Sequence, residues 1–99
     1  MILITGSILA RADTFDALLK ESLAHVHRSR SEPGCIAHDV HVHCEHPLRL
    51  VFVEKWRDEA AVAAHFKVKG SLDFVRAART LAAAPPVIEI FDATKVEMS

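Results

Sequence analysis

Apolar residues form strand-length runs in four segments of the chain and recur with a helix-like period in three. Successive side chains of a strand point to opposite faces, whereas neighbours on one helix face lie three or four residues apart. Alternating or continuous apolar runs predict strands over residues 2–10, 35–44, 48–56 and 87–94. The helical pattern predicts one helix between Thr14 and Pro33 and two more over residues 59–67 and 72–84.

The predicted helices have recognisable ends and faces. Asp13 or Thr14 can cap the first helix, and Asp58 can cap the second. Gly70-Ser71 is expected to separate the second helix from the third. The first helix carries an apolar stripe of Phe15, Leu18, Leu19, Ser22, Leu23 and Val26. The third is expected to pack through Leu72, Val75, Ala78 and Ala82.

The order of these elements is typical of the ferredoxin-like β-α-β-β-α-β subunit, an α+β fold whose helices cover one face of an antiparallel sheet. The other face should meet water and alternate polar with apolar residues. The last predicted strand does not alternate, because Val87 and Phe91 occupy one parity and Ile88 and Ile90 the other. Strands that are apolar on both faces need cover on both. The pattern therefore predicts a homodimer in which two sheets pack face to face.

Composition adds bounds to this interpretation. The 99 residues suffice for a single domain, residues 1–99, and 51% of them are hydrophobic, which also favours a partner for such a small chain. The net charge of −1 comes from well-mixed charges, so we expect no nucleic-acid or membrane partner. The apolar start of the chain lacks the charged region of a signal peptide, and a cytoplasmic location is the default expectation.

Two cysteines and four histidines lie within residues 35–46, CIAHDVHVHCEH, and raise the possibility of a metal site. Strand periodicity divides them between two faces. His41 and His43 share a face with Cys35, whereas His38 lies opposite with Ile36. Zinc needs three or four converging ligands. We therefore predict no native metal site here and place His41 and His43 near the dimer contact.

Several motifs resemble those of the antibiotic biosynthesis monooxygenase (ABM) family, whose members form dimeric α+β barrels. The stretch SRSEPGC, residues 29–35, is similar to one family motif. FVEKWRDEA, residues 52–60, is similar to a second, and His65 resembles the family's helix histidine. The resemblance implies a homodimer with a pocket between sheet and helices in each subunit. It also implies oxygenation of phenols or hydroquinones by O₂ without metal or prosthetic group, although other members degrade haem.

The chain departs from the family pattern at two positions. A second helix histidine is common in the family, and Gly70 stands in its place here. A tyrosine often follows the EPGC motif, but His38 occupies that position and the chain has no tyrosine. Mechanisms that use either residue cannot be transferred. The haem-degrading branch resembles this chain poorly, because its key tryptophan lies on the helix whereas Trp56 lies in a strand.

His65 and Glu54 are the catalytic candidates. The ordinary pKa of histidine suits a general base at neutral pH, and small residues beside His65 leave room for a pocket. Glu54 falls in a strand that should be buried, where a carboxylate needs a partner. It could orient His65 or bind substrate. It could equally serve structure alone, for instance by pairing with Arg79, and His65 could be a structural histidine.

Four further residues are candidates for substrate binding. Trp56 offers a flat wall to an aromatic ligand, and His38 could replace the family's tyrosine as a polar group. Phe66 and Phe74 flank the break between the last two helices and could line the pocket mouth. Packing in the core is the alternative for each of the four.

Two functions fit these observations. The first is a cofactor-independent monooxygenase that oxidises a phenolic or hydroquinone-type small molecule with O₂. No flavin or metal motif is seen, and the expected cofactor is none. The alternative is a non-catalytic small-molecule binding module that uses the same pocket. Metal-dependent chemistry at the histidine-rich strand is a third, weaker reading.

Overall fold

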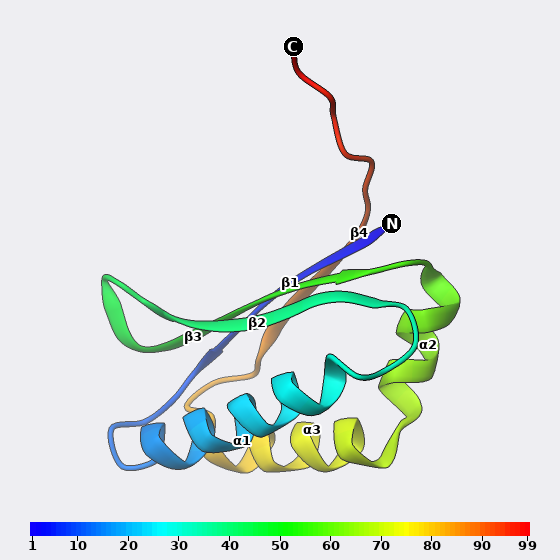
Figure 1. The fold of residues 1–99 in the computed structure, drawn as a ribbon. Coiled ribbons are helices and arrows are strands. Elements are labelled where there is room, and N and C mark those ends of the chain that lie inside the picture. The colour runs from blue at the N-terminus through cyan, green and yellow to red at the C-terminus, as the bar shows by residue number, and fades with distance from the viewer.

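The computed structural model describes residues 1–99 and contains a four-stranded antiparallel sheet with three helices on one face (Figure 1). It confirms the ferredoxin-like prediction, with the helical part of the second half divided in two. The elements in chain order are β1 (Ile2–Leu9), α1 (Phe15–Ser29), β2 (Cys35–His43), β3 (His46–Trp56), α2 (Glu59–Lys67), α3 (Lys69–Leu81) and β4 (Val87–Asp92).

The strands lie in the order β2-β3-β1-β4, and every neighbouring pair is antiparallel. The central strand β1 aligns its Ile4 with Glu54 of β3 and with Ile90 of β4. On the far side of β3, Glu54 aligns with His38 of β2. Residues that are aligned across strands share a face. The register therefore brings Glu54 and His38 together on the face that the helices cover.

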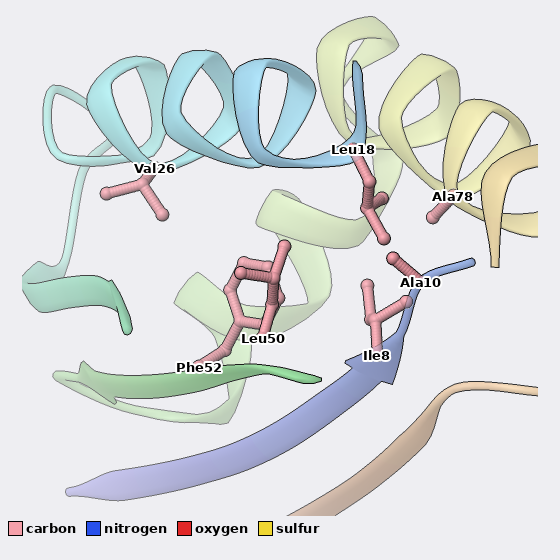
Figure 2. Packing of buried hydrophobic residues seen from close by; sticks show 7 residues of the cluster. All are labelled: Ile8, Ala10, Leu18, Val26, Leu50, Phe52 and Ala78. Atoms are coloured by element: carbon pink, nitrogen blue, oxygen red, sulfur yellow. The ribbon is translucent and has the colours of Figure 1, made fainter. Parts of the chain in front are cut away.

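Buried apolar side chains form two clusters beneath the sheet. The larger joins the sheet to α1 and α3 and consists of Ile8, Ala10, Leu18, Val26, Leu50, Phe52 and Ala78 (Figure 2). The smaller joins the sheet to α2 and consists of Ile2, Ile4, Trp56, Ala61 and Val62. Each fully buried Leu, Ile or Phe contributes roughly 1.5–3 kcal/mol to folding. Along β3, Glu54 lies between Phe52 of the first cluster and Trp56 of the second.

A β-bulge at the start of β2 corrects the predicted faces of this strand. Cys35 aligns with Trp56 and Ala37 with Lys55, so β2 has one extra residue, Ile36, at this point. The extra residue reverses the alternation. Cys35 therefore packs with the smaller cluster, on the same side as His38 and not with His41 as predicted, and the side chain of Ile36 is exposed.

The break between α2 and α3 falls at Val68 and not at Gly70-Ser71, as predicted. Val68 has an extended backbone, with φ −67° and ψ 145°, and it ends α2 and precedes α3. Gly70 lies in the first turn of α3, and the guanidinium of Arg28 packs where a Cβ at this position would be. Close approach of another side chain, and not a break in the helix, explains this glycine.

Two predicted helix faces are also partly wrong. Leu23 of α1 is exposed, and so are Leu72 and Val75 of α3, which were expected to pack. The buried line of α1 runs instead through Leu18, Ser22, His25, Val26 and Ser29. On α3 the fully buried residues are Ser71 and Ala78. The buried positions of both helices are therefore occupied mainly by small and polar residues, where the two helices and the sheet meet.

No helix covers the second face of the sheet, which we call the open face (Figure 1). Phe91 and Val87 of β4 lie on it, aligned with Leu3 and Ser7 of β1. Every residue of β4 is exposed, and Val87, at 57%, is among the most exposed large apolar residues of the sheet. An edge strand that is apolar on both faces is left without cover in the single chain. None of the three helices is long and apolar enough to cross a membrane.

We expect Gly34→Ala to destabilise the fold. Gly34 has φ +83°, where an L side chain is strained, and an added Cβ would lie 2.5 Å from Cβ of Ala61. The backbone strain alone costs about 1–2 kcal/mol, and the contact with the buried Ala61 adds to it. Urea unfolding should show this loss. Gly70→Ala is the matched control, since its Cβ would displace only the flexible end of Arg28, and an equal loss in both variants would contradict the explanation.

Candidate active site

A cavity of about 300 Å³ lies between the helix-covered face of the sheet and helices α2 and α3. Four of the six candidate residues line it: His65, Glu54, Phe66 and Phe74. The remaining lining residues are Gly6, Ser7, Ile8, His25, Phe52, Ser71, Val75, Ala78, Arg79, Pro86, Val87 and Ile88. Small-molecule pockets are typically apolar with a few polar groups, and their volumes begin at roughly 300 Å³. This cavity therefore suits a small, largely apolar ligand.

His65 is buried, and its Nδ1 lies 2.8 Å from Oε1 of Glu32. An ionised carboxylate can only accept a hydrogen bond, so Nδ1 of His65 is the donor. The neutral imidazole then carries its lone pair on Nε2. The ring packs against Trp56, with the centroids 4.5 Å apart. Glu32 belongs to the loop between α1 and β2, and the sequence interpretation did not select it.

His25 is a second buried histidine of the site that sequence interpretation missed. Its ring stacks on Phe74, with centroids 4.2 Å apart and an angle of 10° between the planes. Its Nδ1 lies 2.5 Å from Nη2 of Arg28. Because arginine only donates, Nδ1 accepts and His25 is neutral. Its position could have been found from the spacing of Leu18, Ser22 and His25, which repeats the helix period.

Burial is the main cause that lowers the pKa of His25, to about 3 from an ordinary value of 6.5. The charges of His38, Arg28 and His65 lower it further. His25 therefore stays unprotonated at neutral pH, and Arg28 at its Nδ1 fixes the remaining proton on Nε2. The residue can donate a hydrogen bond into the site but supplies no positive charge there.

Glu54 is held by two neighbours on the same oxygen. The indole Nε1 of Trp56 donates to Oε1 at 2.9 Å. Nε2 of His38 lies 3.2 Å from the same Oε1, although its ring is turned too far for a well-directed hydrogen bond. Burial raises the pKa of Glu54, but the contacts with His38 and Trp56 outweigh it and the net shift is downward. Glu54 is thus ionised, and these two contacts leave Oε2 free.

Trp56 and His38 do not line the cavity, in contrast to the substrate contacts expected of them. Both are fully buried behind Glu54, and we interpret them as supports of its carboxylate. Direct contact of these two residues with a substrate stays a prediction, because neither lines the cavity. Arg79 lines the cavity but makes no ion pair with Glu54, so the structural pairing suggested by the sequence does not form.

The histidine-rich strand does not provide a cluster of metal ligands. His41 is exposed, and the ring of His43 lies beside that of His46 near the turn that follows β2. The chain has one group of three potential ligands, and it consists of His25, His38 and His65. One nitrogen from each ring lies within 4.8 Å of the others, and all three residues are buried. Only His38 of the strand belongs to it.

The family model described as antibiotic biosynthesis monooxygenase matches residues 1–77. This chain belongs to that family. Among curated relatives, YcnE of Bacillus subtilis (strain 168), named as a candidate monooxygenase, is 28% identical over 100% of this chain and 99% of its own length. The uncharacterised protein sll1783 of Synechocystis is 31% identical over 91% of this chain, which spans only 61% of that relative.

Solved structures share the fold of this ABM family member. A candidate antibiotic biosynthesis monooxygenase from Deinococcus radiodurans has a TM-score of 0.94 at 20% identity, covering 100% of this chain and 98% of its own. PA3566 from Pseudomonas aeruginosa has a TM-score of 0.85 at 28% identity, with 95% and 94% covered. The family supports a monooxygenase-like role, and the chemistry must be argued from the site itself.

We expect the stability of the protein to fall as pH is lowered from about 6.5 to about 3. In the unfolded chain His25 gains a proton below its ordinary pKa of 6.5, whereas in the folded chain it does so only near 3. The unfolded state therefore binds more protons across this window, and the free energy of unfolding drops by roughly 4–5 kcal/mol at most.

Urea unfolding at several pH values measures this dependence. His25→Gln keeps an acceptor for Arg28 but does not titrate, so the pH slope of the variant should be smaller than that of the natural chain. Acidic residues contribute equally to both proteins. Parallel slopes for the two would show that His25 is not the group responsible.

Proposed function

We propose that the protein is a cofactor-independent monooxygenase that oxidises a phenolic or hydroquinone-type small molecule with O₂. One observation carries the proposal: His65 at the cavity wall, with its Nδ1 engaged by Glu32 and its Nε2 lone pair available. Family membership supports oxygenation as the type of reaction. The cavity supports an aromatic substrate class, because its side chains include Phe66 and Phe74.

His65 is the proposed general base. A base must carry a lone pair within reach of the proton that it removes, and the Glu32 carboxylate stabilises the imidazolium that forms. The Glu32–His65 contact therefore has the geometry of an acid–histidine dyad. Positioned proton transfer of this kind contributes about 10²–10⁴-fold to a rate.

The reaction follows from the electron-rich anion that this base would generate. Loss of the phenolic proton to His65 leaves a phenolate, which transfers one electron to O₂. The resulting radicals combine to a C–O–O⁻ group at a ring carbon that bears hydrogen, and the imidazolium protonates it. The O–O bond then breaks as the ring C–H proton leaves, which gives a carbonyl and water. One phenol and one O₂ yield one quinone and one water, so the substrate supplies every electron.

Other residues bind and orient in this proposal. Phe66 and Phe74 would contact the faces of the aromatic ring, and apolar walls would exclude water from the phenolate. Free Oε2 of Glu54 would accept a hydrogen bond from a second hydroxyl, which favours hydroquinone-type substrates. Trp56 and His38 are positioning residues that hold this carboxylate. Arg79 could attract an anionic substituent to the cavity.

We also propose that two copies associate through the open face as a cytoplasmic homodimer. Apolar residues that no other part of the chain covers, such as Val87 and Phe91, support this face as the contact. A small domain with much apolar surface gains stability from such burial. The cavity borders β4 at Val87 and Ile88, so the dimer contact would also steady one cavity wall.

We expect metal-free protein to consume O₂ with a hydroquinone or naphthol and to form the quinone. An oxygen electrode measures the O₂ consumed, and absorbance measures the quinone formed in the same turnover. His65→Gln should lower kcat by about 100-fold or more with little change in KM, because the base acts in the chemical step. His27→Gln, an exposed histidine of α1, is the matched control and should retain full activity.

Two results would decide against the proposed reaction. Full turnover by His65→Gln would remove this residue from the chemistry. Saturable binding of aromatic ligands by calorimetry, with no O₂ uptake for any of them, would favour the alternative of a non-catalytic binding module.

We expect light scattering at micromolar concentration to give twice the chain mass of 10.9 kDa. Phe91→Glu places a charge on the open face and should shift the mass towards that of one chain, because burying an unpaired carboxylate is unfavourable. Lys20→Glu, on the exposed side of α1, is the control and should leave the mass unchanged. A natural chain that stays monomeric would contradict the dimer.

A further inference from the structure

We infer that His25, His38 and His65 form a binding site for one divalent transition metal ion of the zinc type. The three residues come from α1, β2 and α2, so the fold and not a local motif brings them together. The site is separate from the proposed chemistry in its requirements, because binding a metal needs no substrate and no O₂.

The three imidazole rings have the spacing of a tetrahedral site. Their centroids lie 5.2 Å apart for His25 and His38, 5.3 Å for His25 and His65, and 5.5 Å for His38 and His65. Metal–nitrogen bonds of about 2.0–2.1 Å put each centroid about 3.2 Å from a zinc ion, and tetrahedral angles then separate the centroids by about 5.2 Å. The nearly equilateral triangle therefore has the right size.

The ligand nitrogens need only a small adjustment. One nitrogen of each ring, Nδ1 or Nε2, now lies within 4.8 Å of the others, whereas nitrogens on one tetrahedral zinc ion are about 3.4 Å apart. The second side-chain torsion of histidine has a broad minimum, so rotation of the rings can close this gap without moving the backbone. The ring planes meet at angles of 83°, 45° and 62°, so no two of the rings are stacked face to face. Stacked rings would leave no room for a shared ligand between them.

Two of the rings are prepared to bind a metal. Glu32 holds the Nδ1 proton of His65, an arrangement that orients metal-binding histidines and strengthens them as donors. His38 is fully buried, its Nδ1 has no partner, and its Nε2 has only the oblique contact with Glu54. Buried polar atoms are almost always paired, so this incompletely paired imidazole has a nitrogen that can serve a ligand.

His25 requires one change, and the structure contains the means for it. Arg28 now occupies Nδ1 of His25, which keeps the proton on Nε2. The Nε atom of Arg28 and Oε2 of Glu32 are both buried without a hydrogen bond and lie 3.9 Å apart. A shift of Arg28 towards Glu32 would pair these two atoms and release His25. Nδ1 could then carry the proton and Nε2 could bind the metal.

The donor set selects the class of metal. Neutral imidazoles suit Zn²⁺, Cu²⁺, Ni²⁺ and Co²⁺ and suit Mg²⁺ and Ca²⁺ poorly. Three protein ligands leave a fourth position open, as in catalytic and not structural zinc sites. His25 and His65 line the cavity, so water or a ligand oxygen could reach that position.

Calorimetry with Zn²⁺ on chelator-treated protein tests the inference. We expect one Zn²⁺ per chain, and Co²⁺ should give the intense visible bands of a tetrahedral complex. His25→Gln and His65→Gln should each lose the tetrahedral spectrum. Glu32→Gln should retain it but weaken Zn²⁺ binding by about 10–100-fold, as expected for a residue that acts through a ligand.

A double variant, His41→Gln with His43→Gln, is the matched control, because it removes two strand histidines that lie outside the triangle and leaves the triangle intact. It should bind Zn²⁺ like the natural chain. Circular dichroism and thermal unfolding of each variant separate lost binding from lost folding. The inference is overturned if the natural chain takes up no stoichiometric Zn²⁺, or if folded His25→Gln and His65→Gln bind it unchanged.

Failure of this inference and failure of the proposed function can be told apart. Calorimetry and the Co²⁺ spectrum report binding whether or not the protein turns over any substrate. If both proposals hold, one equivalent of Zn²⁺ should stop turnover, because the Nε2 lone pair of His65 cannot serve the metal and a proton together. A chelator should restore it. Turnover that continues with Zn²⁺ bound at this triangle would remove His65 as the base and leave the metal site standing.

Discussion

Burial of polar side chains beneath the sheet is the constraint on which the rest of this structure depends. Three imidazoles and the carboxylate of Glu54 occupy space that so small a domain would otherwise fill with apolar groups. Each such group destabilises the fold unless a partner compensates it. Glu54 has Trp56 and His38, and His65 has Glu32. The first two contacts lie within the sheet, between and along β2 and β3, and the third joins α2 to the loop before β2.

The polar layer divides the apolar core into its two clusters. Phe52, Glu54 and Trp56 are successive inward-facing residues of β3. Phe52 belongs to the cluster under α1 and α3 and Trp56 to the cluster under α2, so the polar layer at Glu54 lies between the two. The cavity opens at this boundary, because side chains that must satisfy hydrogen bonds cannot close-pack as aliphatic groups do. Fold stability and the site are therefore linked through the same few contacts.

Much of the fold could be predicted from the sequence, because strand and helix periods and the caps are local signals. The bounds of α2 were predicted as observed, and the strands differ only at their ends. The faces of β2 could not be predicted, since the bulge at Ile36 depends on pairing with β3. The exposure of Leu72 and Val75 could not be predicted for the same reason, because helix propensity does not show which helix face packs against a sheet that is distant in sequence.

The sequence predicted those site residues whose polar character stands out within an apolar segment. His65 and Glu54 are examples, because a polar residue in an apolar segment can be recognised from the sequence alone. His25 and Glu32 did not stand out, because they matter through partners that are distant in sequence. His25 also lies within a helix whose apolar stripe was assigned to the adjacent Val26, and the burial of both shows a wider buried face than the stripe implied.

The bulge in β2 has a consequence for how homologous sequences are compared. The inward orientation of His38 depends on how many residues separate it from Gly34 as much as on its own identity. In a relative that lacks the extra residue at the bulge, the side chain four positions after the glycine would face away from the helices. An ungapped alignment would then equate two positions that have opposite environments. Variation among relatives at this strand is therefore best interpreted by counting back from the β3 register, where Glu54 marks the inward face.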